Sequence, residues 1–171
     1  MKHFLVAILA ALIASGCSGK KAVPASRLTQ PTGRFSYVAP DGWFRTQLAG
    51  VDFIIVSTEP DHGVIPNIFV EGAPRSSSVS NQVTRLIESN RNSMRAYAFV
   101  QQQAFTTGSG LTGVKVTARR ETTDALAVAL YHFSFQDNDR VIDITCSCAD
   151  AVRQTYEPIF DAAMKSLQSE R

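Results

Sequence analysis

Four consecutive strand-like segments, separated only by short turns, dominate the second half of the 171-residue chain. They cover residues 97–106, 111–120, 126–136 and 140–148. In the third segment Tyr131, Phe133 and Phe135 occupy alternate positions, as in a strand with one apolar face. The sequence Asp-Asn-Asp at 137–139 then predicts a tight hairpin into the fourth segment. Because short turns join antiparallel neighbours, these segments predict an antiparallel sheet.

Shorter strands and two helices complete the expected fold. Strands are predicted at about 35–38, 51–57 and 67–72. Apolar side chains at helical spacing from Val79 to Met94 predict a helix, and any of the three serines at 76–78 could cap its start. A second helix is predicted at 150–169, with a kink or a restart at Pro158. The expected fold class is α+β, a mainly antiparallel sheet of about six or seven strands packed by two helices.

The N-terminus has the features of an export signal. A basic start at residues 1–3 precedes an apolar segment at 4–14, which is too short to span a bilayer as a helix. The following Ala-Ser-Gly-Cys at 14–17 resembles a bacterial lipobox. The resemblance implies cleavage between Gly16 and Cys17 and attachment of diacylglyceryl and a further acyl chain, such as palmitate, to Cys17. The alternative is an ordinary secretory signal that leaves a free thiol at Cys17.

These features predict three parts of the chain. Residues 1–16 form a lipoprotein signal peptide, residues 17–33 a lipidated N-terminus and flexible tether, and residues 34–171 a single domain. Ser18, by resemblance to Gram-negative lipoproteins, favours the outer membrane, facing the periplasm. Removing the signal peptide takes away only Lys2 from the 17 basic residues, which leaves 16 against 15 acidic residues. A nearly neutral chain of this kind is not expected to bind nucleic acid.

The order of elements resembles the Mog1/PsbP-like (DcrB-like) family. The resemblance rests on "FSYVAPDGW" at 35–43, "TGSGLTGVKVTARR" at 107–120 and the final strand and helix from 141 to 167. It implies an α/β/α sandwich and a non-enzymatic accessory role. Some members stabilise a membrane-bound photosynthetic complex, some bind a small GTPase, and many bacterial members are envelope lipoproteins. The family supplies no catalytic residue and no cofactor.

A glycine motif in the middle of the chain resembles a dinucleotide fingerprint. Gly108, Gly110 and Gly113 have the G-x-G-x-x-G spacing. That chemistry requires a helix to begin at the loop, so that its N-terminal amides face the pyrophosphate. The alternating segment at 114–118 predicts a strand instead. We therefore expect a β-turn and a close approach of backbone, without a cofactor.

Two cysteines lie two residues apart in the last predicted strand. Cys146 and Cys148 share a face with Ile142 and Ile144, so packed thiols are the first expectation. A disulfide is the alternative, although extended geometry separates the two α-carbons by about 6.5 Å and the strand would have to bend. No metal is expected, since two thiolates without nearby histidines make a poor zinc site.

The remaining candidates are polar residues and one tryptophan. Glu59, Asp61 and His62 lie in one predicted loop and could bind a cation, act as acid and base, or simply contact a partner. The sequence contains no G-x-S-x-G nucleophile elbow, so His132 is not expected to belong to a catalytic triad. Trp43, beside a Pro-Asp-Gly turn, is expected to anchor packing, with partner contact as the alternative.

The function expected from the sequence is a binding or scaffolding role at the cell envelope. The domain would be anchored by lipid at Cys17 and would contact another envelope protein through a sheet face or the loop at 59–66. We expect no enzymatic activity. A small-molecule carrier or sensor, with a cavity between sheet and helix, is the alternative, and a hydrolytic enzyme is the third candidate.

Overall fold

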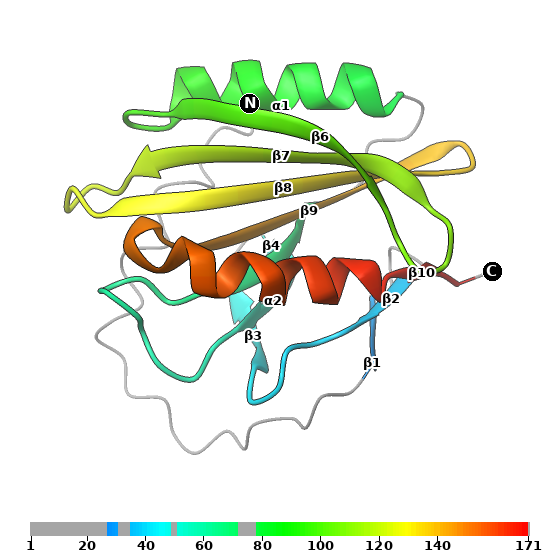
Figure 1. Cartoon of the computed structure of the whole chain (residues 1–171), viewed down its shortest axis with the longest axis horizontal. Coiled ribbons are helices and arrows are strands. Elements are labelled where there is room, and N and C mark those ends of the chain that lie inside the picture. Colours follow the sequence, from blue (N-terminus) through cyan, green and yellow to red (C-terminus); the bar gives the residue numbers. More distant parts are fainter. Residues whose placement is uncertain (1–26, 31–34, 49–50, 72–77, 171) are drawn as a thin grey trace.

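The computed structural model describes residues 27–30, 35–48, 51–71 and 78–170. Its helices and strands are, in chain order, β1 (Arg27–Gln30), β2 (Phe35–Val38), β3 (Phe44–Leu48), β4 (Val51–Val56), β5 (Asn67–Glu71), α1 (Val79–Ser93), β6 (Ala98–Thr106), β7 (Thr112–Glu121), β8 (Ala127–Asp137), β9 (Arg140–Ala149), α2 (Arg153–Lys165) and β10 (Gln168–Ser169). One turn of 3-10 helix at Asp150–Val152 joins β9 to α2. The long central strands and the two helices are visible in Figure 1.

All strand pairs in the two sheets are antiparallel. Seven strands form the main sheet in the order β3-β4-β5-β9-β8-β7-β6, and β1, β2 and β10 form a small second sheet. The prediction of an α+β fold with a mainly antiparallel sheet is confirmed. The four strands predicted in the second half are β6 to β9, and they pair in chain order.

The two helices cover opposite faces of the main sheet. On β8, His132 contacts Asn90 of α1, whereas the ring of the adjacent Tyr131 packs against Phe160 of α2. Successive side chains of a strand point to opposite faces, so α1 and α2 must lie on different sides. Figure 1 shows the ribbon of α2 crossing in front of the sheet.

Three short strands, β1, β3 and β10, were not expected from the sequence. Arg27–Gln30, within the predicted tether at 17–33, form β1 and pair with β2, so this part of the tether prediction is wrong. The predicted second helix ends at Lys165, and Gln168–Ser169 form β10 on the other side of β2. β1, β3 and β10 have only four, five and two residues, so periodicity alone does not reveal them.

Local sequence explains the limits of the helices. Ser78 caps α1, because its hydroxyl accepts a hydrogen bond from the Asn81 backbone N–H at 3.3 Å. In α2 the chain remains one α-helix through Pro158, and no restart occurs there. The irregularity lies earlier, in the 3-10 turn before Arg153.

The predicted hairpin at 137–139 is confirmed. Asn138 has a positive φ of 54°, a conformation that asparagine tolerates in tight hairpin turns. Arg140 Nε donates to Asp137 Oδ2 at 2.7 Å, and the Ser169 hydroxyl donates to the same oxygen at 2.9 Å. The hairpin therefore holds the C-terminal strand β10 in place.

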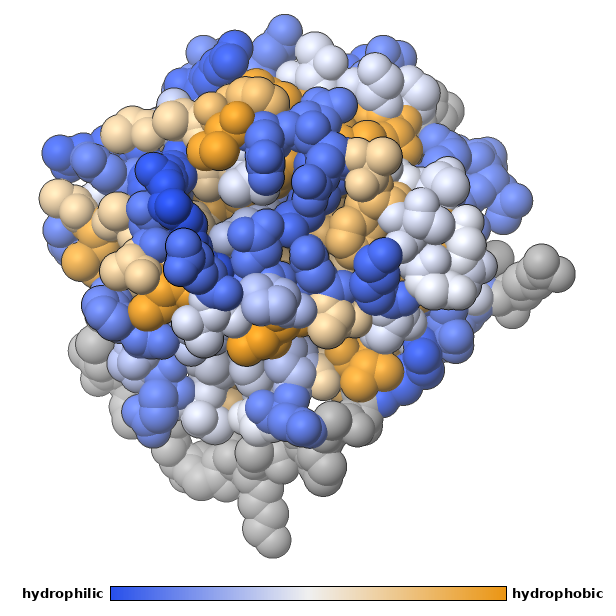
Figure 2. Space-filling model, viewed as in Figure 1, coloured by the Kyte–Doolittle hydropathy of each residue, from blue (hydrophilic) through white to orange (hydrophobic). Residues whose placement is uncertain are grey.

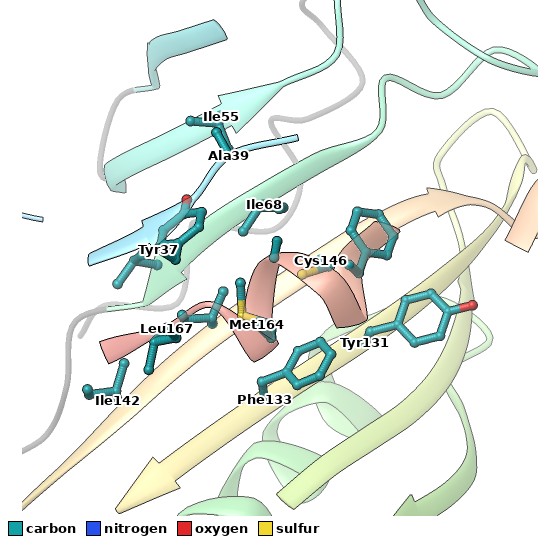
Figure 3. Close-up of a cluster of buried hydrophobic side chains, with 14 of the residues drawn as sticks. Tyr37, Ala39, Ile55, Ile68, Tyr131, Phe133, Ile142, Cys146, Met164 and Leu167 are labelled. Carbon is teal, nitrogen blue, oxygen red and sulfur yellow. The ribbon is translucent and has the colours of Figure 1, made fainter. Parts of the chain in front are cut away.

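The main core lies between the sheet and α2. Its largest members are aromatic and include Tyr131, Phe133, Phe135 and Phe160, none of them measurably exposed. Figure 3 shows Met164 and Leu167 directed toward the sheet residues that it labels. Full burial of each large apolar side chain contributes roughly 1.5–3 kcal/mol. This core fixes α2 on the sheet and thereby positions the loops beside it.

Candidate functional site

The loop between β4 and β5 carries three of the predicted site residues, Glu59, Asp61 and His62. Asp61 Oδ1 lies 2.7 Å from His62 Nδ1, so the structure brings these two side chains together. Glu59 is exposed, and its backbone carbonyl accepts a hydrogen bond from the Ser57 hydroxyl at 2.7 Å. No contact described in this loop joins the Glu59 carboxylate to the other two side chains.

The loop is folded back on itself by backbone hydrogen bonds. The Asp61 N–H donates to the Val64 carbonyl at 2.8 Å, and the Val64 N–H donates to the Asp61 carbonyl at 3.0 Å. Two left-handed residues, His62 with φ of 48° and Gly63 with φ of 78°, make the turn between them. Val64 is 6% exposed and anchors the loop in the hydrophobic cluster that also contains Leu126. The loop therefore has a defined shape.

The loop rests on the start of α2. A hydrogen bond with His62 lowers the pKa of Asp61. A hydrogen bond with Tyr156 of α2 lowers it further, by a smaller amount. Burial and the Asp61 carboxylate raise the pKa of the Tyr156 hydroxyl, which therefore stays protonated as the donor. Because the Asp61 side chain lies at the surface and is 35% exposed, these contacts stabilise the fold only slightly. Their effect is to hold an ionised carboxylate beside His62.

Trp43 packs against Tyr156 in the same region and is only 6% exposed. Its ring centroid lies 6.1 Å from that of Phe160 in an edge-on arrangement and 6.5 Å from that of Tyr156. These are favourable aromatic geometries. The expectation that Trp43 anchors packing is confirmed, and the tryptophan offers little surface to a partner.

A second polar group lies beneath α1. His132 Nδ1 lies 2.7 Å from Thr145 Oγ1, and its Nε2 lies 3.4 Å from Asn90 Nδ2. A neutral ring with the proton on Nδ1 satisfies both contacts, and burial lowers the pKa of His132 to about 4. The Ser134 hydroxyl donates to Asp143 Oδ1 at 2.6 Å, so this serine bonds a carboxylate and not the imidazole. The arrangement is not that of a nucleophile activated by histidine.

The sequence analysis did not single out a lysine that is buried on the other face of the main sheet, against α2. Lys115 is not measurably exposed, yet its Nζ lies 2.7 Å from Glu157 Oε1 and 2.7 Å from Asp161 Oδ1 on α2. The ammonium also lies 5.2 Å from the centroid of Tyr131. The available signal was a lysine at an inward position of an alternating strand, with two carboxylates one helical turn apart on α2. This group joins the helix to the sheet.

The two cysteines of β9 are free and buried in the core. Burial raises the pKa of Cys148 to about 12 and places the pKa of Cys146 well above that of an ordinary thiol. Both side chains are therefore neutral. The two cysteines are packed thiols, as first expected, and no disulfide joins them.

The glycine motif forms a turn, and the strand predicted after it is confirmed as β7. Gly110 has φ of 88°, and the Gly108 N–H donates to the Lys165 carbonyl at 2.7 Å. A Cβ on Gly113 would lie 2.1 Å from the Ser134 carbonyl oxygen, so backbone passes directly over this position. No helix begins here to receive a pyrophosphate.

Gly16 and Cys17, the predicted cleavage and lipidation positions, lie outside the described residues. Within the described part of the chain, no three histidine, cysteine or acidic side chains are grouped as a metal site would require. No helix in that part has the length and hydropathy needed to cross a membrane.

Comparison with solved structures identifies the architecture. Cyanobacterial PsbP (CyanoP) from Synechocystis sp. PCC 6803 superposes with a TM-score of 0.63 and 16% identity, over 92% of this chain and 98% of that one. LpqN of Mycobacterium tuberculosis, described as involved in cell envelope biogenesis, gives 0.60 and 13%, over 85% and 90%. The chain has the Mog1/PsbP fold.

A third example of the Mog1/PsbP fold comes from a eukaryote. The Ran-binding protein Mog1p of Saccharomyces cerevisiae superposes with a TM-score of 0.57 and 10% identity, over 84% of this chain and 94% of that one. No family model matches the sequence, and no curated protein matches it. At these identities the likeness concerns the fold alone, so the function of this Mog1/PsbP-like domain must be argued from its own residues.

Proposed function

We propose that this protein is a lipid-anchored envelope protein with a non-enzymatic binding or accessory role. Cys17 would carry the lipid, Ser18 would direct the protein to the outer membrane, and the domain would face the periplasm. The loop at residues 57–66 would contact a second envelope protein. The observation that carries the proposal is this loop, which presents polar side chains in a preformed shape.

The shape of the loop favours recognition. Binding is weakened when a loop must be ordered, and a loop already held by paired backbone hydrogen bonds avoids that cost. His62 and Glu59 are exposed, while Val64 is buried beneath them. The buried Val64 thus fixes the loop, and the exposed charged and polar groups give a partner definite positions to recognise.

The location of the loop favours the same conclusion. α1 packs on β7 and β8 and α2 on β8 and β9, so partner contact through the central part of a sheet face is the weaker form of the proposal. On the side that carries α2, hydrophilic residues predominate and hydrophobic residues form small separate groups (Figure 2). A partner that approaches this side would meet a mainly polar surface, and non-obligate interfaces are about as polar as the rest of a protein's surface.

The buried ionisable groups described above argue against catalysis. Lys115 is neutralised by two carboxylates of α2, and His132 and Asp143 are engaged beneath α1. The rings between sheet and α2 pack against one another, with Tyr131 and Phe160 at 5.6 Å and Phe105 and Phe133 at 5.0 Å. This filled interface favours a binding role over a carrier role.

In-cell photo-cross-linking tests the proposal. A benzoyl-phenylalanine at His62 is compared with the same probe at Glu88, an exposed position on α1. We expect one adduct of defined mass from position 62, none from position 88, and loss of the adduct in the Cys17→Ser form. Equal adducts from both positions, or no adduct from position 62, would contradict the proposal.

A further inference from the structure

The strand β6 is a bare edge of the main sheet. Among the described strands it pairs only with β7, and its other side is open. α1 packs mainly on β8 and β7 rather than on β6. Eight of its nine residues are exposed, and only Phe105 is buried. Phe99 and Val100 are 39% and 50% exposed, which is unusual for large apolar side chains in this protein.

This edge has little of the usual protection against pairing with another chain. Exposed edge strands are normally protected by charged residues, proline or β-bulges. β6 reads AFVQQQAFT and contains no charged residue and no proline. Its one protective feature is a bulge at Val100, between Phe99 and Gln101, which leaves the segment from Gln101 onward regular. The opposite edge, β3, is shorter and carries Arg45.

The sequence of β6 is nearly symmetric about Gln102. In both directions from Gln102 a glutamine is followed by a small or β-branched apolar residue and then by a phenylalanine. An antiparallel pair of two such strands, with the two-fold axis at Gln102, would set Gln102 opposite its copy and Gln101 opposite Gln103. Glutamine amides both donate and accept hydrogen bonds, so these pairs are complementary. No like charges would face each other.

The faces of the two sheets also match. Gln103 is directly opposite Lys115 and Gln102 is opposite Val116 in β7, so neighbouring glutamines point to alternate faces. A two-fold axis perpendicular to the sheet keeps each face continuous between copies. We propose that β6 pairs with β6 of a second copy of this chain, in the register centred on Gln102. The bulge at Val100 ends the ladder, so the interface is short and the dimer weak.

Cross-linking of single cysteines tests the register. Full-length protein carrying Gln102→Cys is treated with a mild oxidant in isolated membranes and run without reductant. Because Gln102 faces its own copy, we expect a covalent dimer. Gln101→Cys, which faces Gln103 of the copy, and Glu88→Cys on α1 should form far less. Equal yields from all three positions, or no dimer from position 102, would overturn the proposal.

A charge exchange supplies an independent test. Differently tagged copies of the wild-type chain should co-purify, whereas two Gln102→Lys copies, or two Gln102→Glu copies, should separate because like charges oppose each other. A Gln102→Lys copy should again co-purify with a Gln102→Glu copy, which shows that the variants fold. Failure of the mixed pair, or undiminished pairing of the lysine variant with itself, would overturn the proposal. The loop at 57–66 is untouched, so its partner adduct tests the proposed function separately.

Discussion

The Lys115 ammonium lies 2.7 Å from the carboxylates of both Glu157 and Asp161, although its side chain has no measurable exposure. The lysine belongs to the sheet and the two acids to α2, so the contact fixes the helix over β7. Each carboxylate is about one-third exposed, at 35% and 33%. The charge that is deeply buried is therefore the ammonium alone.

Lys115→Ala is expected to lower the free energy of unfolding by about 3 kcal/mol at most, the lower end of the range for breaking a buried ion pair, because the carboxylates that it leaves are about one-third exposed. Lys115→Met should cost less, because it leaves the same carboxylates but keeps an apolar stem against Tyr131 and Phe133. Urea unfolding of the three proteins measures the difference. An alanine variant as stable as the wild type would show that the pair contributes nothing.

His132 should make the protein sensitive to acid. Its pKa is lowered to about 4 in the folded state from the ordinary 6.5, so below pH 6.5 the unfolded chain binds more protons. Its contribution to stability is complete above pH 6.5 and is lost as the pH falls toward 4, by roughly 3 kcal/mol at most. Burial raises the pKa of Asp143, which has the opposite effect as pH rises through that pKa.

Unfolding of the wild type and of His132→Gln at pH 7, 5.5 and 4.5 separates the two effects. The stability difference between the proteins should shrink as the pH falls, because only the wild type must exclude a proton from position 132. A difference that stays constant over this range would show that His132 titrates normally in the folded protein.

Gly113 is expected to tolerate no side chain. A Cβ there would lie 2.1 Å from the Ser134 carbonyl oxygen, which is backbone and cannot move aside easily. Gly113→Ala should cost about 1–3 kcal/mol or more, as overpacking does. Gly110→Ala is the matched control, since it meets open space and incurs only the strain of its positive φ, about 1–2 kcal/mol. Thermal unfolding that ranks the two variants in the reverse order would refute this account of the turn.

The buried thiols should be inert until the protein unfolds. In the Cys17→Ser protein, Cys146 and Cys148 should not react with Ellman's reagent at pH 8, because burial raises both pKa values and excludes the reagent. Both should react in concentrated urea. Rapid reaction of the folded protein, or a mass two hydrogens lower after purification in air, would contradict the packed-thiol arrangement.

Sequence periodicity predicted the parts of the fold that depend on local pattern. The strands β6 to β9 and the helix α1 are of this kind, since each presents an alternating or helical repeat over many residues. β1, β3 and β10 were not predicted, because each is short and depends on pairing with β2 or β4. Neither the alternating nor the helical pattern indicates which distant elements contact each other.

The candidate sites follow the same division. Adjacent Asp61 and His62 could be expected to meet, and they do so at 2.7 Å. The pairing of Lys115 with Glu157 and Asp161 joins residues 42 and 46 positions apart, and it depends on where α2 crosses the sheet. The burial of His132 likewise depends on α1, which supplies Asn90 from 42 positions earlier in the chain.

The tether at Cys17 is the central claim of the proposed function, since it determines where the loop at 57–66 meets a partner. Mass spectrometry of the N-terminal peptide, from protein extracted from membranes, tests it most directly. We predict a peptide that begins at Cys17 and carries the mass of diacylglyceryl and a further acyl chain, with unprocessed precursor in Cys17→Ser. An unmodified Cys17, or normal processing of the serine variant, would contradict the account.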